Sequence, residues 1–235
     1  MHIFDTIKTS VLVPIHPAGR PFIAIFVVAT VILTMIWEHL FFPGLILTLW
    51  CVYFFRNPVR VTPQRADLVI SPADGRVLSV EDLPPPAELD LPDGKYTRIA
   101  IFMNVFDVHV NRAPMAGVIT DKFYFPGAFF NASLDKASSQ NERLGLVMKT
   151  DHGPTIGFIQ IAGLVARRIL CDVSEGDQLT TGEHYGIIRF GSRVDVWLPK
   201  PVKVLVAPGQ TTLAGETMIP DCARGAKAMA ESIAR

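Results

Sequence analysis

Cysteine is scarce in this chain of 235 residues, which contains only Cys51, Cys171 and Cys222. The number is odd and no CxxC spacing occurs, which argues against a disulfide framework and against a zinc site. We therefore predict no metal centre and expect reduced thiols in a protein that faces the cytoplasm.

Charge is also scarce and shows no bias of sign. Charged residues make up 19% of the chain and the formal net charge is zero. Nucleic-acid-binding proteins usually carry a basic excess, so this class is disfavoured and no nucleic-acid partner is expected. The mean hydropathy is nevertheless high at +0.33. Most of this excess lies between Pro21 and Phe55.

The segment from Pro21 to Phe55 has the composition of a membrane anchor, since its only ionisable residues are Glu38 and His39. It is too long for a signal peptide and lacks the polar face of a soluble helix. Each half has roughly 16 to 18 apolar residues, near the short end of the about 20 that a span needs. We predict two short helices with a turn near Glu38–Gly44. A hairpin within one leaflet fits nearly as well, and a buried helical pair in a soluble core is a weaker alternative.

Basic residues flank both ends of this anchor: Lys8, Arg20, Arg56 and Arg60. The positive-inside rule then places both ends, and the domain that follows, on the cytoplasmic side of the cell (inner) membrane. The domains are predicted as an anchor over 1–56 and a second domain over 57–235. Short runs of β-branched and aromatic residues alternate there with Gly/Pro turns, which predicts a mainly β (α+β) fold, a sandwich or small barrel. The Ala-rich tail favours a helix.

One serine stands out in the second domain, within "IIRFGSRVDVWLP" at 187–199. Read as one strand, this stretch places Ser192 on an apolar face, directly after Gly191. A bulge or a close backbone approach is the ordinary explanation. A hydrolase nucleophile is disfavoured because "FGSRV" is not a G-x-S-x-G elbow. A third reading is an N-to-O acyl shift, in which the serine attacks the preceding carbonyl, the chain breaks and a pyruvoyl group forms.

Five stretches in the same order resemble the phosphatidylserine decarboxylases in their short bacterial and archaeal form. They are "SPADGRV" (71–77), "FMNVFDVHVNRAP" (102–114), "FNASLDKASSQNER" (130–143), "IAGLVARRI" (161–169) and "TTGEHYGIIRFGSRVDVWLP" (180–199). The N-terminal anchor is similar as well. The resemblance implies self-cleavage between Gly191 and Ser192, giving a β chain of 1–191 and an α chain of 192–235. These chains would stay together as a heterodimer, and whether two heterodimers pair is left open.

The resemblance also implies the chemistry. A covalent pyruvoyl group made from Ser192 would form a Schiff base with the amine of phosphatidylserine, and loss of CO2 would yield phosphatidylethanolamine. The substrate is a membrane lipid, which agrees with the anchor. "FYFPGAFF" (123–130) is a candidate rim for its acyl chains, with an ordinary core strand as the alternative.

An acid/base group is needed for cleavage and for turnover, and histidine suits both. His109 lies in the Asp-x-His segment and is the first choice; the other histidines read as solvated or structural, namely His2, His16, His39, His152 and His184. Asp74 is expected to orient the base, and Asp107, which would share a strand face with His109, is a second candidate for that role. Larger family members carry a second histidine three residues after the first, where this chain has Arg112. Either His109 serves both steps, or Arg112 binds the substrate carboxylate or phosphate.

Two alternatives stay open at this stage. A membrane-anchored lipoyl or biotinyl carrier or adaptor barrel would need Lys149 at a hairpin tip, whereas the sequence puts it at the end of a strand. A decarboxylase of a related serine phospholipid would carry the same motifs, because fold and motif do not fix the substrate.

Overall fold

A computed structural model describes residues 13–128, 130–133, 140–163, 168–189 and 191–222, and the backbone of 231–234. The chain divides into two compact units, one ending at Val59 and the other beginning at Arg60. Each unit is described by itself below.

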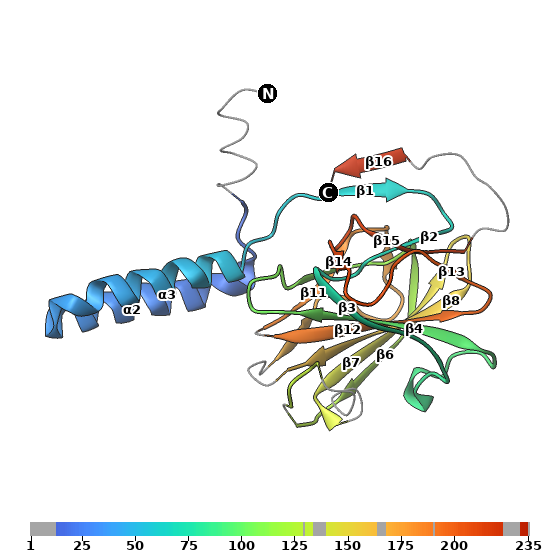
Figure 1. The fold of residues 1–235 in the computed structure, drawn as a ribbon, viewed down its shortest axis with the longest axis horizontal. Coiled ribbons are helices and arrows are strands. Elements are labelled where there is room, and N and C mark those ends of the chain that lie inside the picture. The colour runs from blue at the N-terminus through green and yellow to red at the C-terminus, as the bar shows by residue number, and fades with distance from the viewer. Residues whose placement is uncertain are drawn as a thin grey trace. The chain divides into compact units, whose positions relative to one another are not determined.

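The first unit is an antiparallel pair of apolar helices, α2 (Arg20–Ile36) and α3 (Phe41–Phe54), with the short turns η1 (Pro17–Gly19) and η2 (Glu38–Leu40) (Figure 1). Small residues form the seam between the helices. A side chain added at Gly44 would place its Cβ 2.6 Å from Thr30 Cγ2, so only glycine allows this approach. The hydroxyls of Thr30 and Thr48 lie 3.2 Å apart across the seam. Small and hydroxyl-bearing residues are the usual contacts between helices in membranes.

The predicted pair of apolar helices is confirmed, although the turn lies at Trp37–Leu40 and Gly44 belongs to α3. The helical stretch Pro17–Ile36 is long and apolar enough to cross a membrane, with a mean hydropathy of 2.1. The stretch Glu38–Phe54 is apolar but shorter. The second helix is therefore at the lower limit of the length that a span requires.

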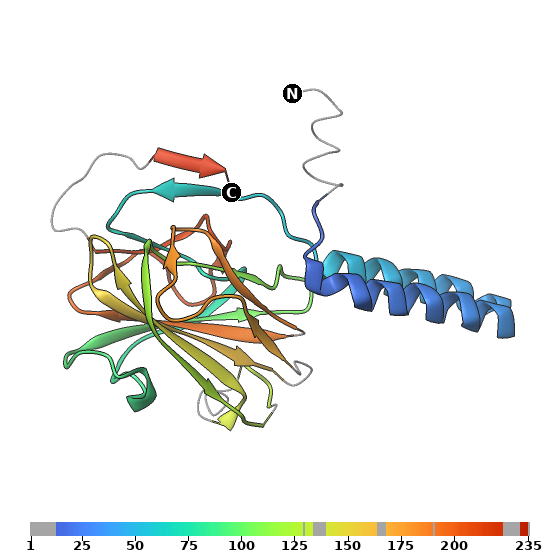
Figure 2. The same ribbon diagram turned by 180° about the vertical axis from the view of Figure 1, so that it is seen from behind.

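The second unit is built on a curved, antiparallel eight-stranded sheet (Figures 1 and 2). Its strands, in spatial order, are β10 (Gln178–Leu179), β6 (Gly117–Phe125), β7 (Arg143–Thr150), β8 (Thr155–Ala162), β12 (Ser192–Pro199), β4 (Tyr96–Met103), β3 (Gly75–Leu83) and β14 (Thr211–Thr212). Strand β12, which begins at the serine singled out above, lies between β8 and β4 near the middle of the sheet. The turn η3 (Ala87–Leu89) lies in the connection from β3 to β4.

Smaller sheets complete the unit, and the predicted mainly β fold is confirmed. One contains β5 (Val110–Arg112), β11 (His184–Ile188) and β9 (Ile169–Cys171), and another contains β13 (Lys203–Val204), β15 (Met218–Asp221) and β2 (Leu68–Ile70). Strand β1 (Val61–Gln64) pairs with β16 (Glu231–Ala234). The helix expected for the tail is therefore wrong over 231–234, because that backbone pairs with β1; residues 223–230 lie outside the described part.

Both faces of the large sheet are covered at β12. On one face, Val194, Val196 and Leu198 join a core that includes Ile188 of β11 and Ile219 of β15. On the other face, Trp197 packs with a second cluster that contains Leu89, Tyr96, Val147, Ile159 and Ile161. Strand β12 is therefore a central strand with both faces buried.

The reading of 187–199 as one strand is wrong. Strand β11 ends at Ile188 and β12 begins at Ser192, in different sheets. Arg193 and Asp195, on the opposite face of β12 from Ser192, are each 1% exposed. They form a two-point ion pair of 2.5 and 2.8 Å, which balances both charges inside the protein.

Candidate active site

The Gly191–Ser192 bond lies where the chain passes from the small sheet to the large one. Gly191 has φ +64°, in the left-handed region that glycine occupies at little cost. Ser192 is 0% exposed and pairs with Met103 on β4 and with Ala162 on β8. Its hydroxyl lies 3.9 Å from the sulfur of Met103. The serine therefore stands on the core face of β12, as the sequence predicts.

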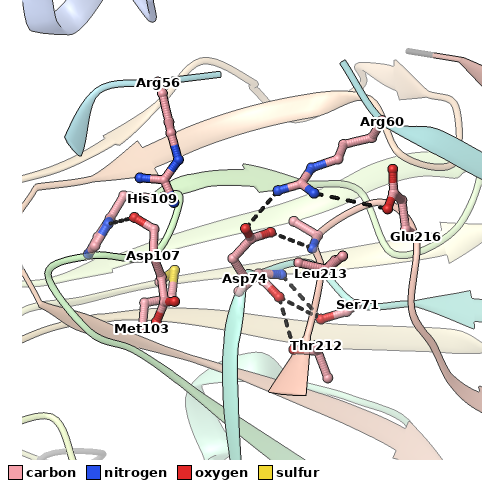
Figure 3. Close-up of polar contacts among 12 residues, drawn as sticks. Arg56, Arg60, Ser71, Asp74, Met103, Asp107, His109, Thr212, Leu213 and Glu216 are labelled. Carbon is pink, nitrogen blue, oxygen red and sulfur yellow. Dashed lines mark hydrogen bonds and ion pairs between the residues drawn. The ribbon is translucent and has the colours of Figure 1, made fainter. Parts of the chain in front are cut away.

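His109 contacts the backbone N–H of the glycine that precedes this serine. The backbone N–H of Gly191 donates to His109 Nε2 at 3.2 Å. Because an N–H can only donate, Nε2 carries the lone pair, and Nδ1 donates to the backbone carbonyl of Asp107 at 3.0 Å. Figure 3 shows the ring beside that residue. The neutral tautomer so defined is the form in which histidine acts as a base, and its basic nitrogen faces the predicted cut.

The carboxylate of Asp107 serves another purpose. It accepts hydrogen bonds from the backbone N–H and side-chain amide of Asn104, at 2.8 and 2.6 Å, and so closes a turn. Residues 104–107 are not in a strand, so the expectation that Asp107 and His109 share a strand face is wrong. Asp107 orients the ring through its backbone carbonyl.

Asp74 occupies the turn between β2 and β3. Its Oδ2 accepts from Arg60 Nη2 at 2.6 Å and its Oδ1 accepts from the backbone N–H of Ala214 at 2.7 Å (Figure 3). Burial raises the pKa of this carboxyl, an effect that the nearby Arg60 guanidinium and the Ala214 N–H only partly offset. Among the described residues, His109 makes no hydrogen bond to Asp74. A direct Asp74–His109 bond of the kind found in triads is therefore not part of this arrangement.

Arg112 lies on β5 and is 2% exposed. Its Nη1 donates to the backbone carbonyl of Gly182 at 3.0 Å. Burial, followed by the neighbouring Arg60, lowers the pKa of its guanidinium to about 10. The predicted contact between Arg112 and a substrate carboxylate or phosphate stays a prediction.

Sequence reasoning missed three residues of this site. Arg60 was read only as a flanking charge of the anchor, yet it is the ion-pair partner of Asp74. Met103 and Asn141 lie inside the quoted motifs, which do not show their contacts. Strand pairing places Met103 opposite Ser192, and the Asn141 amide donates to Ala162, the other strand partner of Ser192. Lys149 pairs with Thr155 inside the β7–β8 ladder, at the end of a strand as predicted, which leaves the carrier alternative without its hairpin-tip lysine.

The surroundings of Ser192 fit a pyruvoyl group. The residue is removed from water, a glycine precedes it, and an imidazole accepts from the N–H of that glycine. The fold and site together agree with one class: a self-processing proenzyme whose catalytic group is made from its own serine.

Comparison with known proteins agrees with this class and identifies the family within it. A family model for phosphatidylserine decarboxylase matches residues 47–220. The chain is 56% identical over 214 residues to the phosphatidylserine decarboxylase proenzyme of Ruegeria pomeroyi, which covers 91% of this chain and 98% of that protein. The chain belongs to the phosphatidylserine decarboxylase family. It is a carboxy-lyase that acts on phosphatidylserine, and the family uses a pyruvoyl group derived from serine.

Proposed function

We propose that this chain matures by cutting itself between Gly191 and Ser192, and that the new end of β12 is the decarboxylation centre. The contact that carries this proposal is the hydrogen bond from the Gly191 N–H to His109 Nε2. It places a base of fixed tautomer against Gly191, the residue whose carbonyl must react.

The cleavage proceeds in balanced steps. The Ser192 hydroxyl attacks the Gly191 carbonyl carbon; the C–N bond breaks, an ester C–O bond forms and the hydroxyl proton passes to the released amine. Loss of the Ser192 Cα proton then expels the Gly191 carboxylate and leaves dehydroalanine. Water hydrolyses its imine form, which releases ammonia and leaves a ketone. His109 is the proposed carrier of the first proton, because its imidazole contacts the N–H of Gly191, whose carbonyl reacts.

In turnover, the pyruvoyl group supplies a ketone that binds the substrate amine and withdraws the electron pair left by CO2. The chain supplies the rest. Strand β12 and the clusters on its two faces keep bulk water from position 192. His109 is the proposed donor of the proton that replaces the lost carboxyl group. The two oxygens of Asp74 accept from Arg60 and Ala214, and Asp74 is not proposed as a contact to the substrate.

The membrane assignment follows from the first unit. The apolar stretch Pro17–Ile36 supports association with a bilayer. The basic flanks support an inner-membrane location with the catalytic unit on the cytoplasmic side. For the acyl-chain rim, Tyr124 is 56% exposed and Phe130 is 42% exposed, whereas Phe123 is partly buried against the second cluster. Phe129 lies outside the described residues. Tyr124 and Phe130 are the proposed lipid contacts of this segment.

The test is the mass of the chain itself. Purified protein should give two fragments that meet at 191/192, and the fragment from 192 should carry a pyruvoyl end in place of serine. Ser192→Ala should stay a single chain without decarboxylase activity, because it has no hydroxyl to attack Gly191. Ser133→Ala, which changes an exposed hydroxyl, is the matched control and should mature normally. An uncut wild-type chain with an intact Ser192 and normal activity would refute the proposal.

A further inference from the structure

Gly163 lies against the carbonyl that the proposed cut requires. It directly follows β8, whose last residue, Ala162, pairs with Ser192. A Cβ added at Gly163 would overlap the Gly191 carbonyl oxygen and would lie 2.9 Å from the Gly191 carbonyl carbon. Real Cβ atoms do not approach other atoms so closely, so the backbone of Gly163 itself is in contact with the reacting carbonyl.

The peptide that carries Gly163 is held in place by Asn141, which is 0% exposed. The Asn141 amide donates to the Ala162 carbonyl at 2.7 Å and to the Phe130 carbonyl at 2.7 Å. Its oxygen accepts from the Phe130 N–H at 2.9 Å. The Ala162 N–H donates to the Glu142 carbonyl at 2.9 Å. The N–H and the carbonyl of Ala162, the residue before Gly163, are therefore both held by hydrogen bonds. The backbone of Gly163 is thus fixed on this side.

Gly191, in contrast, is the adjustable partner. Its φ of +64° is one of several conformations open to glycine, and the nearest atom to a Cβ added there is Val105 Cγ1 at 4.0 Å. A side chain at position 163 would be attached to the fixed Ala162–Gly163 backbone and would press against the movable carbonyl of Gly191. The steric strain would then be relieved by turning the Gly191 carbonyl away.

We propose that Gly163 is a positioning residue for self-cleavage: its bare backbone keeps the Gly191 carbonyl turned for attack by Ser192 and leaves room for the oxygen as the carbon becomes tetrahedral. The inference rests on the proposed cut and assigns a residue that orients it. Attack on a carbonyl depends steeply on alignment, and a displacement of about 1 Å costs about 100-fold in rate.

The experiment follows maturation of purified full-length Gly163→Ala by intact mass, together with its thermal midpoint. We expect a folded chain that is cut about 100-fold more slowly than the wild type. Gly117→Ala is the matched control, because its Cβ would also strike backbone, 2.8 Å from Thr150 Cα, at the far end of the β6–β7 ladder from the cut. It should mature at the wild-type rate even if its midpoint falls.

A second measurement separates positioning from stability. Neutral hydroxylamine cleaves esters, so it should split the wild-type proenzyme at Gly191 through the ester form. Gly163→Ala should be split far more slowly, because the ester forms far more slowly. Asn141→Asp adds no Cβ but loses the N–H bonds to Ala162 and Phe130; it should also mature slowly, and it serves as the test if Gly163→Ala does not fold.

Wild-type cleavage or hydroxylamine sensitivity in Gly163→Ala would overturn the inference. An equal loss of cleavage in Gly117→Ala at an equal loss of stability would overturn it too. If the wild-type chain itself is not cut at 191/192, the proposed function fails first, so the two failures are distinguishable.

Discussion

At the residue scale, two backbone groups fix the imidazole of His109. The carbonyl of Asp107 holds Nδ1 and the N–H of Gly191 meets Nε2. A base that is oriented by a carbonyl keeps its tautomer without a buried carboxylate beside it. The side chain of Asp107 closes a turn by accepting hydrogen bonds from Asn104.

This arrangement predicts unequal effects of two neighbouring substitutions. His109→Ala removes the proposed base and should slow cleavage at 191/192 by about 100-fold or more, the lower end of what a general base contributes. Asp107→Ala keeps the backbone carbonyl and should slow it far less. Time courses of the two purified proenzymes, read by intact mass, decide the matter. Equal losses in the two variants would assign the orienting role to the carboxylate instead.

The sequence could propose Ser192, Gly191 and His109 because each lies in a short contiguous motif. It could not identify the partner of Asp74. Arg60 and Ala214 approach that carboxylate from positions 14 residues before and 140 residues after it, through the packing of separate segments. Contacts of such separation depend on topology, which a single sequence pattern does not contain.

At the element scale, alternation predicted the correct faces of β12 but not its beginning. The apolar positions continue in phase across the junction, so the pattern looks like one strand from 187 to 199. A positive φ at Gly191 interrupts the extended conformation there, and the chain passes from one sheet to another. The helical hairpin was easier to predict, because long apolar runs have few alternatives.

The seam of that hairpin gives a prediction of its own. With the native cysteines changed to serine, Thr30→Cys and Thr48→Cys should form a disulfide on oxidation, since the native hydroxyls lie 3.2 Å apart. Adding Gly44→Leu should sharply reduce this cross-link, because its side chain would enter the space of Thr30. Leu47→Ala, an exposed position on α3, is the control and should leave the yield unchanged. An undiminished yield in Gly44→Leu would show that α2 and α3 do not need this close approach.

At the scale of the whole molecule, the proposed cut leaves its two products interleaved. Strand β12 of the 192–235 fragment lies between β8 and β4 of the other. Further contacts cross the cut: the Ser71 N–H donates to the Thr217 carbonyl at 2.7 Å, and the Gly215 N–H donates to the Ser71 carbonyl at 2.9 Å. The core is shared between the fragments rather than divided.

The fragments should therefore co-elute in native gel filtration and separate only in denaturant. The physical reason is that removing β12 would open two strand ladders and expose the core on both faces. The check is the composition of the eluted peak by mass spectrometry, with fragments separated in urea as the reference. Elution as separate species in native buffer would contradict the arrangement.

The origin of the proposed group in residue 192 of the chain itself has a consequence for the life of the enzyme. A group made from residue 192 of β12 belongs to one chain and cannot be exchanged for a fresh one from solution. Each molecule would thus receive its reactive group once. Chemical loss of that ketone would end the activity of that copy, and the cell would restore it only by synthesising another chain, so the supply of this catalyst is set by translation and not by the level of a vitamin.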